Sequence, residues 1–154
     1  MKDRLSLSLK WVYLAALCVG IFTGFGNMPL WRRYYIADIP GFYWTRNFII
    51  NVNVHYVAGS ILLFISLYFL TTYLLMKKNG LALTGCGKTC AALMGMALLT
   101  GLIMALKCFP GINYPMKLLI FFNLAHLGST CLFMFSALSC AATRKKWVKQ
   151  INQG

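Results

Sequence analysis

Four long apolar stretches, separated by short polar connections, dominate the sequence. They run Trp11–Leu30, Phe48–Met76, Cys90–Leu106 and Leu118–Ala142. Each reaches or approaches the ~20 residues that a helix needs to cross a hydrocarbon core about 30 Å thick. Because lipid offers the backbone no hydrogen-bond partner, these stretches are predicted to be helices. The expected fold is all-α: an integral membrane four-helix bundle with up-down-up-down topology, formed by residues 1–154 as a single transmembrane domain.

The composition excludes several classes of function. Hydrophobic residues make up 60% of the chain and charged residues 11%, which is too little polar surface for a protein dissolved in water. The net charge of +13 does not indicate nucleic-acid binding, since the basic residues punctuate the apolar stretches as topology signals do. Anionic lipid headgroups and an acidic partner subunit are the expected counter-charges. Asp3 and Asp38 are the only acids, which argues against a paired-carboxylate mechanism or a carboxylate metal cage.

The distribution of Lys and Arg predicts the orientation. The two termini and the middle connection carry ten basic residues: Lys2, Arg4, Lys10, Lys77, Lys78, Lys88, Arg144, Lys145, Lys146 and Lys149. The other two connections carry five: Arg32, Arg33, Arg46, Lys107 and Lys117. The positive-inside rule therefore places both termini in the cytoplasm.

The chain has two histidines, and both fall inside predicted spans. His55 lies seven residues after Phe48 and His126 lies eight residues after Leu118, which is about 10 Å and 12 Å along their helices. The second and fourth helices run in the same direction, so the two imidazoles are expected at nearly the same depth. Ionisable residues within a span are functional candidates. This pair suits a single haem b iron that is bound from both faces.

Small residues are expected at the same level on all four helices. Thr23-Gly24 and Thr100-Gly101 lie six or seven residues from the outer ends of the first and third stretches. Gly59 follows His55 by one turn, and Gly128 follows His126. Glycine allows a helix backbone to approach a neighbour or a flat ring, so these residues are candidates for a porphyrin-binding surface. The recurring Thr-Gly and His also predict a two-plus-two internal repeat.

Other interpretations of these residues stay open. Each histidine can instead stabilise the bundle by hydrogen bonding across helices. Zinc is disfavoured, because no Cys, Asp or Glu lies at the same level. Asn51 and Asn123 can orient a ligand or bond between helices. Four basic side chains can pair with haem propionates or simply extend to the membrane interface: Arg33, Arg46, Lys107 and Lys117.

The six cysteines are expected to carry no chemistry. Cys86 and Cys90 form a C-x-x-x-C in a short connection. Four lie within or at the edge of apolar stretches, where cysteine usually acts as a small hydrophobe: Cys18, Cys108, Cys131 and Cys140. The chain has no C-x-x-C-H, so covalent c-type haem attachment is not expected.

These features together resemble the cytochrome b membrane subunits of respiratory complexes. Thr-Gly in helices one and three and His in helices two and four are similar to the formate dehydrogenase and thiosulfate reductase cytochrome b subunits. The stretches Phe22-Thr-Gly-Phe-Gly-Asn-Met-Pro-Leu30 and Arg33-Tyr-Tyr-Ile-Ala-Asp-Ile-Pro-Gly41 look like one branch of that group. The resemblance covers roughly residues 10–143.

The resemblance implies haem b, a quinone pocket and an extrinsic redox subunit, in the inner membrane of a bacterium. The quinone is menaquinone or ubiquinone, and its candidate contacts are Tyr56, next to His55, and the basic residues of the two outer connections. Many relatives carry two haems, whereas this chain has no histidines for a second bis-histidine site. The aromatic connection Trp31–Asn47 can anchor at the membrane interface, dock the extrinsic subunit, or do both.

Two other functions are alternatives to electron transfer. A cofactor-free membrane anchor explains the spans and the basic ends, but not the matched histidines. A quinone-linked thiol oxidase needs reactive cysteines on the oxidising side, whereas Cys86 and Cys90 are predicted to be cytoplasmic.

Overall fold

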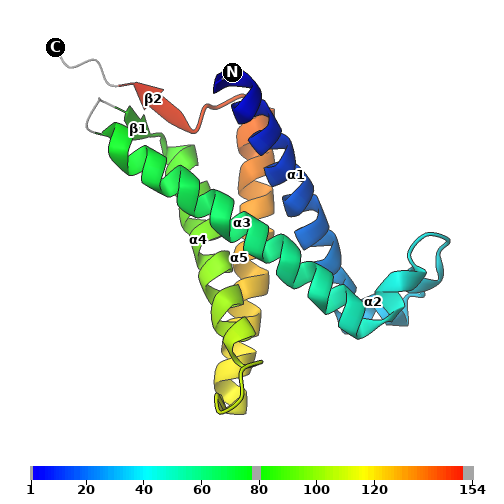
Figure 1. The fold of residues 1–154 in the computed structure, drawn as a ribbon. Helices are drawn as coiled ribbons and strands as arrows, with labels where there is room; N and C mark the ends of the chain where they lie inside the picture. The colour runs from blue at the N-terminus through cyan, green and yellow to red at the C-terminus, as the bar shows by residue number, and fades with distance from the viewer. Residues whose placement is uncertain (1, 78–80, 151–154) are drawn as a thin grey trace. The chain divides into compact units, whose positions relative to one another are not determined.

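The computed structural model describes residues 2–77 and 81–150 and is built from helices (Figure 1). The helices are α1 (Lys2–Gly26), α2 (Pro29–Arg33), α3 (Phe48–Lys77), α4 (Gly85–Leu106) and α5 (Met116–Ala142), with two 3-10 turns, η1 (Ile36–Asp38) and η2 (Tyr43–Arg46). Two short strands, β1 (Leu81–Leu83) and β2 (Val148–Gln150), complete it. The chain forms two compact units, Met1–Leu67 and Tyr68–Gly154, so α3 contributes residues to both.

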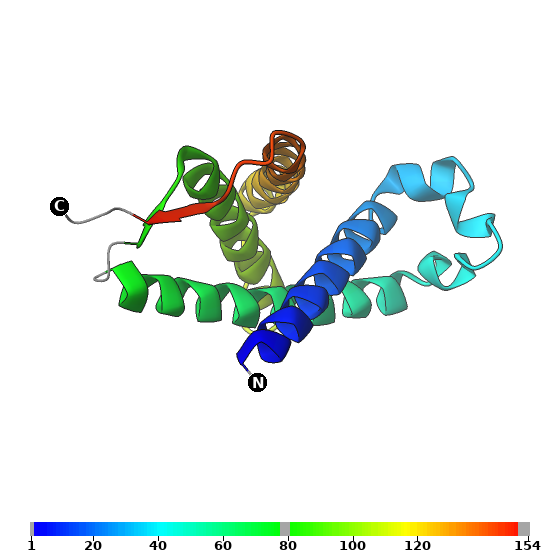
Figure 2. The same ribbon diagram turned by 90° about the horizontal axis from the view of Figure 1, so that it is seen from above.

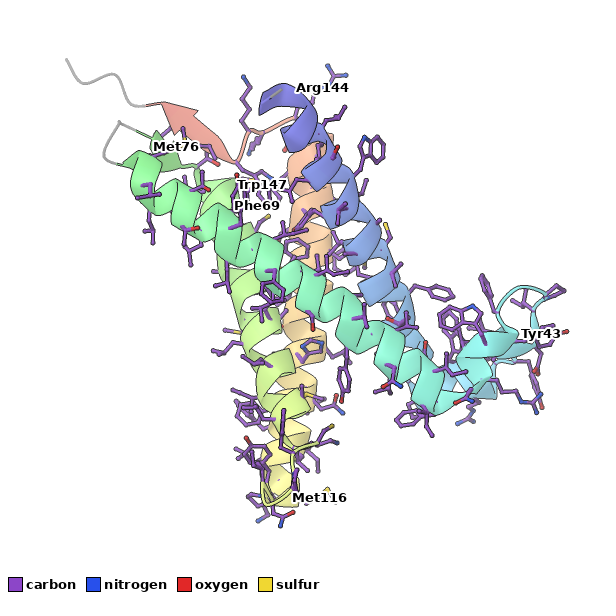
Figure 3. All side chains as sticks on the ribbon, viewed as in Figure 1. Tyr43, Phe69, Met76, Met116, Arg144 and Trp147 are labelled. Carbon is purple, nitrogen blue, oxygen red and sulfur yellow. A yellow bond between two sulfur atoms is a disulfide. The ribbon has the colours of Figure 1, made fainter. Side chains whose placement is uncertain are left out.

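Four of these helices are long and apolar enough to cross a membrane: Leu7–Gly26 within α1, Phe48–Met76 within α3, and the whole of α4 and α5. Their outer surfaces are apolar as well. Phe64, Leu75 and Met116 are each more than 70% exposed, and side chains of this kind surround the helices (Figure 3). Apolar surface of this extent is stable in lipid and not in water. The protein is therefore an all-α, multi-pass membrane protein, as the sequence predicts.

Several helix ends differ from the predicted spans. The first helix begins at Lys2, and its apolar span at Leu7 rather than Trp11. The first stretch was expected to continue to Leu30, but α1 ends at Gly26 and a new short helix begins at Pro29. A proline disfavours helical conformation at the residue before it and donates no backbone hydrogen bond, so it separates the two helices. The fourth span begins at Met116 rather than Leu118, directly after Pro115 at the N-cap position.

The start of α4 corrects a second prediction. Cys90 was expected to begin the third span, with Cys86 in a connection, but both lie inside α4. The reason is Thr84, which takes the N-cap position and accepts the Gly87 N–H at 3.1 Å through its side-chain oxygen. A capping threonine satisfies one of the backbone donors that the first turn of a helix leaves unpaired.

The segment after α5 folds back onto the start of α4. Strand β2 pairs with β1 in an antiparallel register that aligns Val148 with Leu83, an arrangement that the sequence did not predict. Thr84 joins the two segments, because its N–H donates to the Trp147 carbonyl at 3.0 Å and its hydroxyl donates to the Lys146 carbonyl at 2.8 Å. A Cβ on Gly87 would collide with that same Trp147 carbonyl, so glycine is required there.

The two interhelical connections that precede the histidines share a Pro-Gly turn. In Pro40-Gly41 and Pro110-Gly111 the glycine has a φ of +95° and +89°. In each turn the residue after glycine donates its N–H to the carbonyl before proline, at 3.0 and 3.3 Å. Proline followed by a positive-φ glycine is the signature of a type II turn. His55 follows Pro40 by 15 residues and His126 follows Pro110 by 16, so the spacing from turn to histidine is nearly equal in the two helix pairs.

The cap at Thr84 can be tested with Thr84→Val. The change removes the acceptor of the Gly87 N–H and the donor to the tail, and we expect a loss of about 1 kcal/mol, or roughly fivefold faster amide exchange at Gly87. Hydrogen exchange followed by mass spectrometry of the detergent-solubilised protein measures this. Thr89→Val is the matched control, since Thr89 donates only to Gly85 within the same helix. Equal exchange rates in the two variants would contradict the role of the cap.

Candidate cofactor-binding histidines

His55 is held by the backbone of α1. Its Nδ1 lies 3.1 Å from the Gly20 carbonyl oxygen and 3.0 Å from the Thr23 hydroxyl. Thr23 is fully buried, and its hydroxyl donates its own proton to the Val19 carbonyl at 2.7 Å. The hydroxyl proton is therefore already used, so the Thr23 oxygen faces Nδ1 as a second acceptor.

This arrangement fixes the protonation of the ring. A carbonyl oxygen can only accept a hydrogen bond, so Nδ1 of His55 must carry a proton to bond Gly20. In the neutral imidazole the lone pair is then on Nε2. The hydrogen-bond geometry thus selects the Nδ1–H tautomer.

His126 repeats the arrangement in the second unit. Its Nδ1 lies 2.8 Å from the Ala97 carbonyl oxygen and 3.4 Å from the Thr100 hydroxyl. Thr100 is buried and donates to the Met96 carbonyl at 2.7 Å, as Thr23 does to the carbonyl four residues before it. The same reasoning gives His126 a proton on Nδ1 and a lone pair on Nε2.

A glycine lies beside each imidazole. A Cβ at Gly24 would lie 3.4 Å from Cε1 of His55, and one at Gly101 would lie 3.0 Å from Cε1 of His126. The second distance is too short for an ordinary contact, so Gly101 allows the ring to approach α4. Gly59 and Gly128 differ, because a Cβ at either would meet nothing within 4 Å among the described residues. Their predicted role beside a porphyrin stays a prediction.

The two units thus share one pattern of contacts. The histidine bonds a carbonyl, the threonine lies three residues after that carbonyl, and the glycine lies four residues after it. The sequence grouped the Thr-Gly pairs and the histidines as one haem site, and that role stays a prediction. It did not predict that the imidazoles would bond the threonine hydroxyls and the carbonyls of Gly20 and Ala97. The available signal was the small residue that lies three positions before each threonine. A small side chain there leaves the carbonyl open to a neighbouring helix.

The observed helix starts change the predicted depths of the two histidines along their helices. His55 lies seven residues from the start of α3, but His126 lies ten residues from the start of α5, because that helix begins at Met116. At 1.5 Å per residue these depths are about 10 Å and 15 Å. The difference along the helices is therefore about 5 Å, larger than the sequence predicted.

Asn51 joins α3 to the end of α1. It is fully buried, and its Nδ2 donates to the Thr23 carbonyl at 3.1 Å and to Oδ1 of Asn27 at 2.8 Å. Of the two interpretations of this residue, bonding between helices is the one that the structure contains. Its Oδ1 has no hydrogen-bond partner among the described residues. Asn123 is exposed on α5.

The aromatic connection packs partly onto α1. The rings of Trp31, Phe42 and Trp44 lie 5.1 to 6.0 Å from the Phe22 ring, centroid to centroid. The Trp31 indole N–H donates to the buried Thr45 hydroxyl at 3.0 Å. These residues therefore form a small core at the end of the first helix pair.

The predicted propionate partners lie at helix ends. Arg46 Nη1 is 3.5 Å from Asp38 in an exposed ion pair, which contributes little to stability. Arg33 ends α2, Lys107 follows the last residue of α4, and Lys117 lies in the first turn of α5. All of these side chains are exposed, and their role toward haem stays a prediction.

Comparison of the chain with models of protein families, with curated proteins and with solved structures finds no match.

The close approach of Gly101 can be tested with Gly101→Ala. The added methyl group would press on the His126 ring and weaken its bond to Ala97, so we expect a loss of about 1–3 kcal/mol. Thermal unfolding in detergent, followed by circular dichroism, measures the change. Gly95→Ala is the matched control on the same helix, where a Cβ meets nothing within 4 Å among the described residues. That variant should be neutral or stabilised by up to about 1 kcal/mol. Similar unfolding of the two variants would show that the His126 contact contributes little.

Proposed function

We propose that the protein is a haem b-binding membrane subunit that passes electrons between a partner redox subunit and a membrane quinone. In this proposal Nε2 of His55 and Nε2 of His126 are the two axial ligands of one haem. The observation that carries it is the matched pair of bonds from Nδ1 to a backbone carbonyl, at 3.1 Å for His55 and 2.8 Å for His126.

The histidine contacts fit a metal ligand. Histidines that bind metals usually donate the other ring N–H to a carbonyl or carboxylate, which fixes the tautomer and raises the basicity of the ligating nitrogen. Both histidines have such a donor bond, and each lies on an apolar helix beside a glycine. Two imidazoles in apolar surroundings suit haem better than zinc, which normally takes four protein or water ligands.

The number of ligands supports a single haem. Each unit contains one histidine, and the chain has only two, so a bis-histidine centre requires both. A second centre of that kind has no ligands left. Haem, when bound, supplies one-electron reduction and oxidation of its iron. Transfer across the whole membrane would then need a quinone near this haem or a further redox centre in a partner.

The remaining features agree with a subunit of a larger complex. The chain has a net charge of +13, which favours an acidic partner and anionic lipid. In the aromatic connection Tyr34 is 68% exposed and Tyr43 is 59% exposed. Exposed tyrosines of this kind suit either the membrane interface or a docking surface.

The proposal predicts a b-type spectrum. Protein purified from haem-replete cells should show a reduced-minus-oxidised difference spectrum of a bis-histidine haem, with one haem per chain by the pyridine haemochrome assay. A quinol should reduce this haem. Apoprotein that remains colourless after haem-replete expression would favour the cofactor-free anchor, in which the histidine bonds only join helices.

Two single variants test the ligands. His55→Ala and His126→Ala should each abolish the bis-histidine spectrum completely, because one ligand alone cannot complete that ligation. Asn53→Ala and Leu124→Ala, which alter exposed residues two positions before each histidine, are the matched controls and should retain the spectrum. A loss of half of the haem in each histidine variant would mean one haem in each unit and would contradict shared ligation.

A further inference from the structure

Three cysteines meet where α4 begins and α5 ends. Cys86 and Cys90 lie in the first two turns of α4, and Cys140 lies near the end of α5. Because these helices run antiparallel and pack side by side (Figure 2), their residues from opposite ends of the unit's sequence come together. The three sulfur atoms all lie within 4.8 Å of one another. Cys86 and Cys140 form a disulfide with a Cα–Cα distance of 6.3 Å.

The third cysteine, Cys90, is buried next to that disulfide. Cys90 is a free thiol and is completely buried, whereas Cys86 and Cys140 are partly exposed. A reagent in solution therefore reaches Cys90 least easily of the three. Its sulfur, however, is close enough to either disulfide sulfur to exchange with it after a small side-chain movement.

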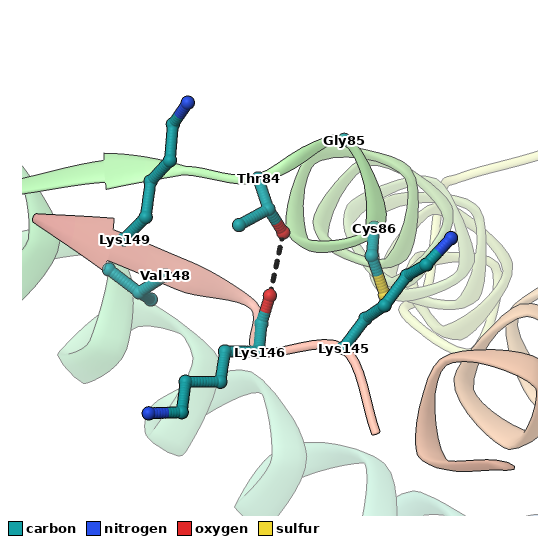
Figure 4. Close-up of a pocket in the computed structure, with 7 residues that line it drawn as sticks. All are labelled: Thr84, Gly85, Cys86, Lys145, Lys146, Val148 and Lys149. Atoms are coloured by element: carbon teal, nitrogen blue, oxygen red, sulfur yellow. Dashed lines mark hydrogen bonds between the residues drawn. The ribbon is translucent and has the colours of Figure 1, made fainter. Parts of the chain in front are cut away.

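Cys86 opens onto a basic cleft. The cleft is lined by Thr84, Gly85, Cys86, Lys145, Lys146, Val148 and Lys149 (Figure 4). Both acids of the chain, Asp3 and Asp38, belong to the first unit, so no carboxylate side chain in the second unit neutralises these lysines. The cleft therefore favours anions, and its positive charge would favour Cys86 as the sulfur that leaves when the disulfide opens.

The location of the cluster gives an independent reason to expect redox activity. The positive-inside rule predicts a cytoplasmic position for this end of the chain. Cytoplasmic disulfides are usually transient and either catalytic or redox-sensing, and a purely structural disulfide would be unusual there.

We propose that Cys86, Cys90 and Cys140 form a thiol–disulfide exchange site that reacts with small anionic disulfides in the lysine cleft. In the first step the Cys90 sulfur attacks the sulfur of Cys140, and its proton passes to the departing Cys86 sulfur, which lines the cleft and releases the proton to water. The Cys86–Cys140 bond breaks, a Cys90–Cys140 bond forms, and the electron pair leaves on the Cys86 sulfur. This step is an isomerisation, so it needs no external oxidant or reductant.

The second step modifies Cys86. Its thiolate, now exposed to the cleft, attacks a low-molecular-weight disulfide such as oxidised glutathione. A mixed disulfide forms on Cys86, and one glutathione thiolate leaves and takes a proton from water. Glutathione carries carboxylates, which pair with the lysines that line the cleft.

The isomerisation can be followed by peptide mapping. Lys88 separates Cys86 from Cys90, so trypsin places them in different peptides. In a Cys131→Ser background, Cys140 is the only cysteine in the tryptic peptide 118–144. The full-length protein, equilibrated in glutathione buffers and digested without reduction, should give both Cys86–Cys140 and Cys90–Cys140 linked peptides. Detection of only the Cys86–Cys140 peptide at every glutathione ratio would overturn the proposal.

The modification of Cys86 gives a second, kinetic test. Oxidised glutathione should add to Cys86 at least tenfold faster in the Cys131→Ser protein than after the further change Cys90→Ser, which cannot release Cys86. Cys18→Ser, added to the same background, is the matched control and should react like the parent. Equal rates with and without Cys90 would contradict the exchange.

The proposed preference of the lysine cleft for anions can be tested with disulfides of opposite charge. Cystamine, a cationic disulfide, should react several-fold more slowly than oxidised glutathione at low salt, and Lys145→Gln with Lys149→Gln should reduce that preference. A bound zinc ion that protects all three thiols from alkylation would instead identify a metal site and overturn the exchange proposal.

Discussion

The hydrogen bond from a histidine Nδ1 to a backbone carbonyl is the interaction on which each helix pair depends. It joins α3 to α1 in the first unit and α5 to α4 in the second. In an apolar setting an unpaired imidazole N–H is costly, so this bond determines which face of each helix meets its neighbour. The buried threonine and the glycine beside the ring are consequences of that approach, since both must leave room for the imidazole.

The sequence predicts most of the fold for a simple physical reason. Lipid requires every backbone group to be paired within the chain, so length and hydropathy alone locate four helices. The helix ends were less predictable, because they depend on single residues. Pro29 begins a new helix after α1 ends at Gly26. Thr84 caps α4, which therefore begins at Gly85, five residues before the apolar stretch begins at Cys90. The strand pair was not predictable, because its partners are separated by more than sixty residues.

The candidate functional residues also include some that the sequence revealed and some that it did not. His55, His126 and their Thr-Gly partners were recognisable, because polar groups within apolar stretches are rare. The cysteine cluster was not recognisable, because an apolar environment already explains the presence of each cysteine considered alone. Only the antiparallel pairing of α4 with α5 brings Cys140 to Cys86 and Cys90. The signal available in the sequence was the number of residues between each cysteine and the connecting Pro-Gly turn, which places the three cysteines at the same end of the α4–α5 hairpin.

The acceptors at Gly20 and Ala97 are main-chain atoms, and this has a consequence for evolution. Any small residue at those positions presents the same oxygen, as the difference between glycine and alanine already illustrates. Mutation can replace the side chain without deleting the acceptor. Divergent proteins can therefore keep this histidine-anchoring geometry while sharing little beyond a histidine and a few small residues.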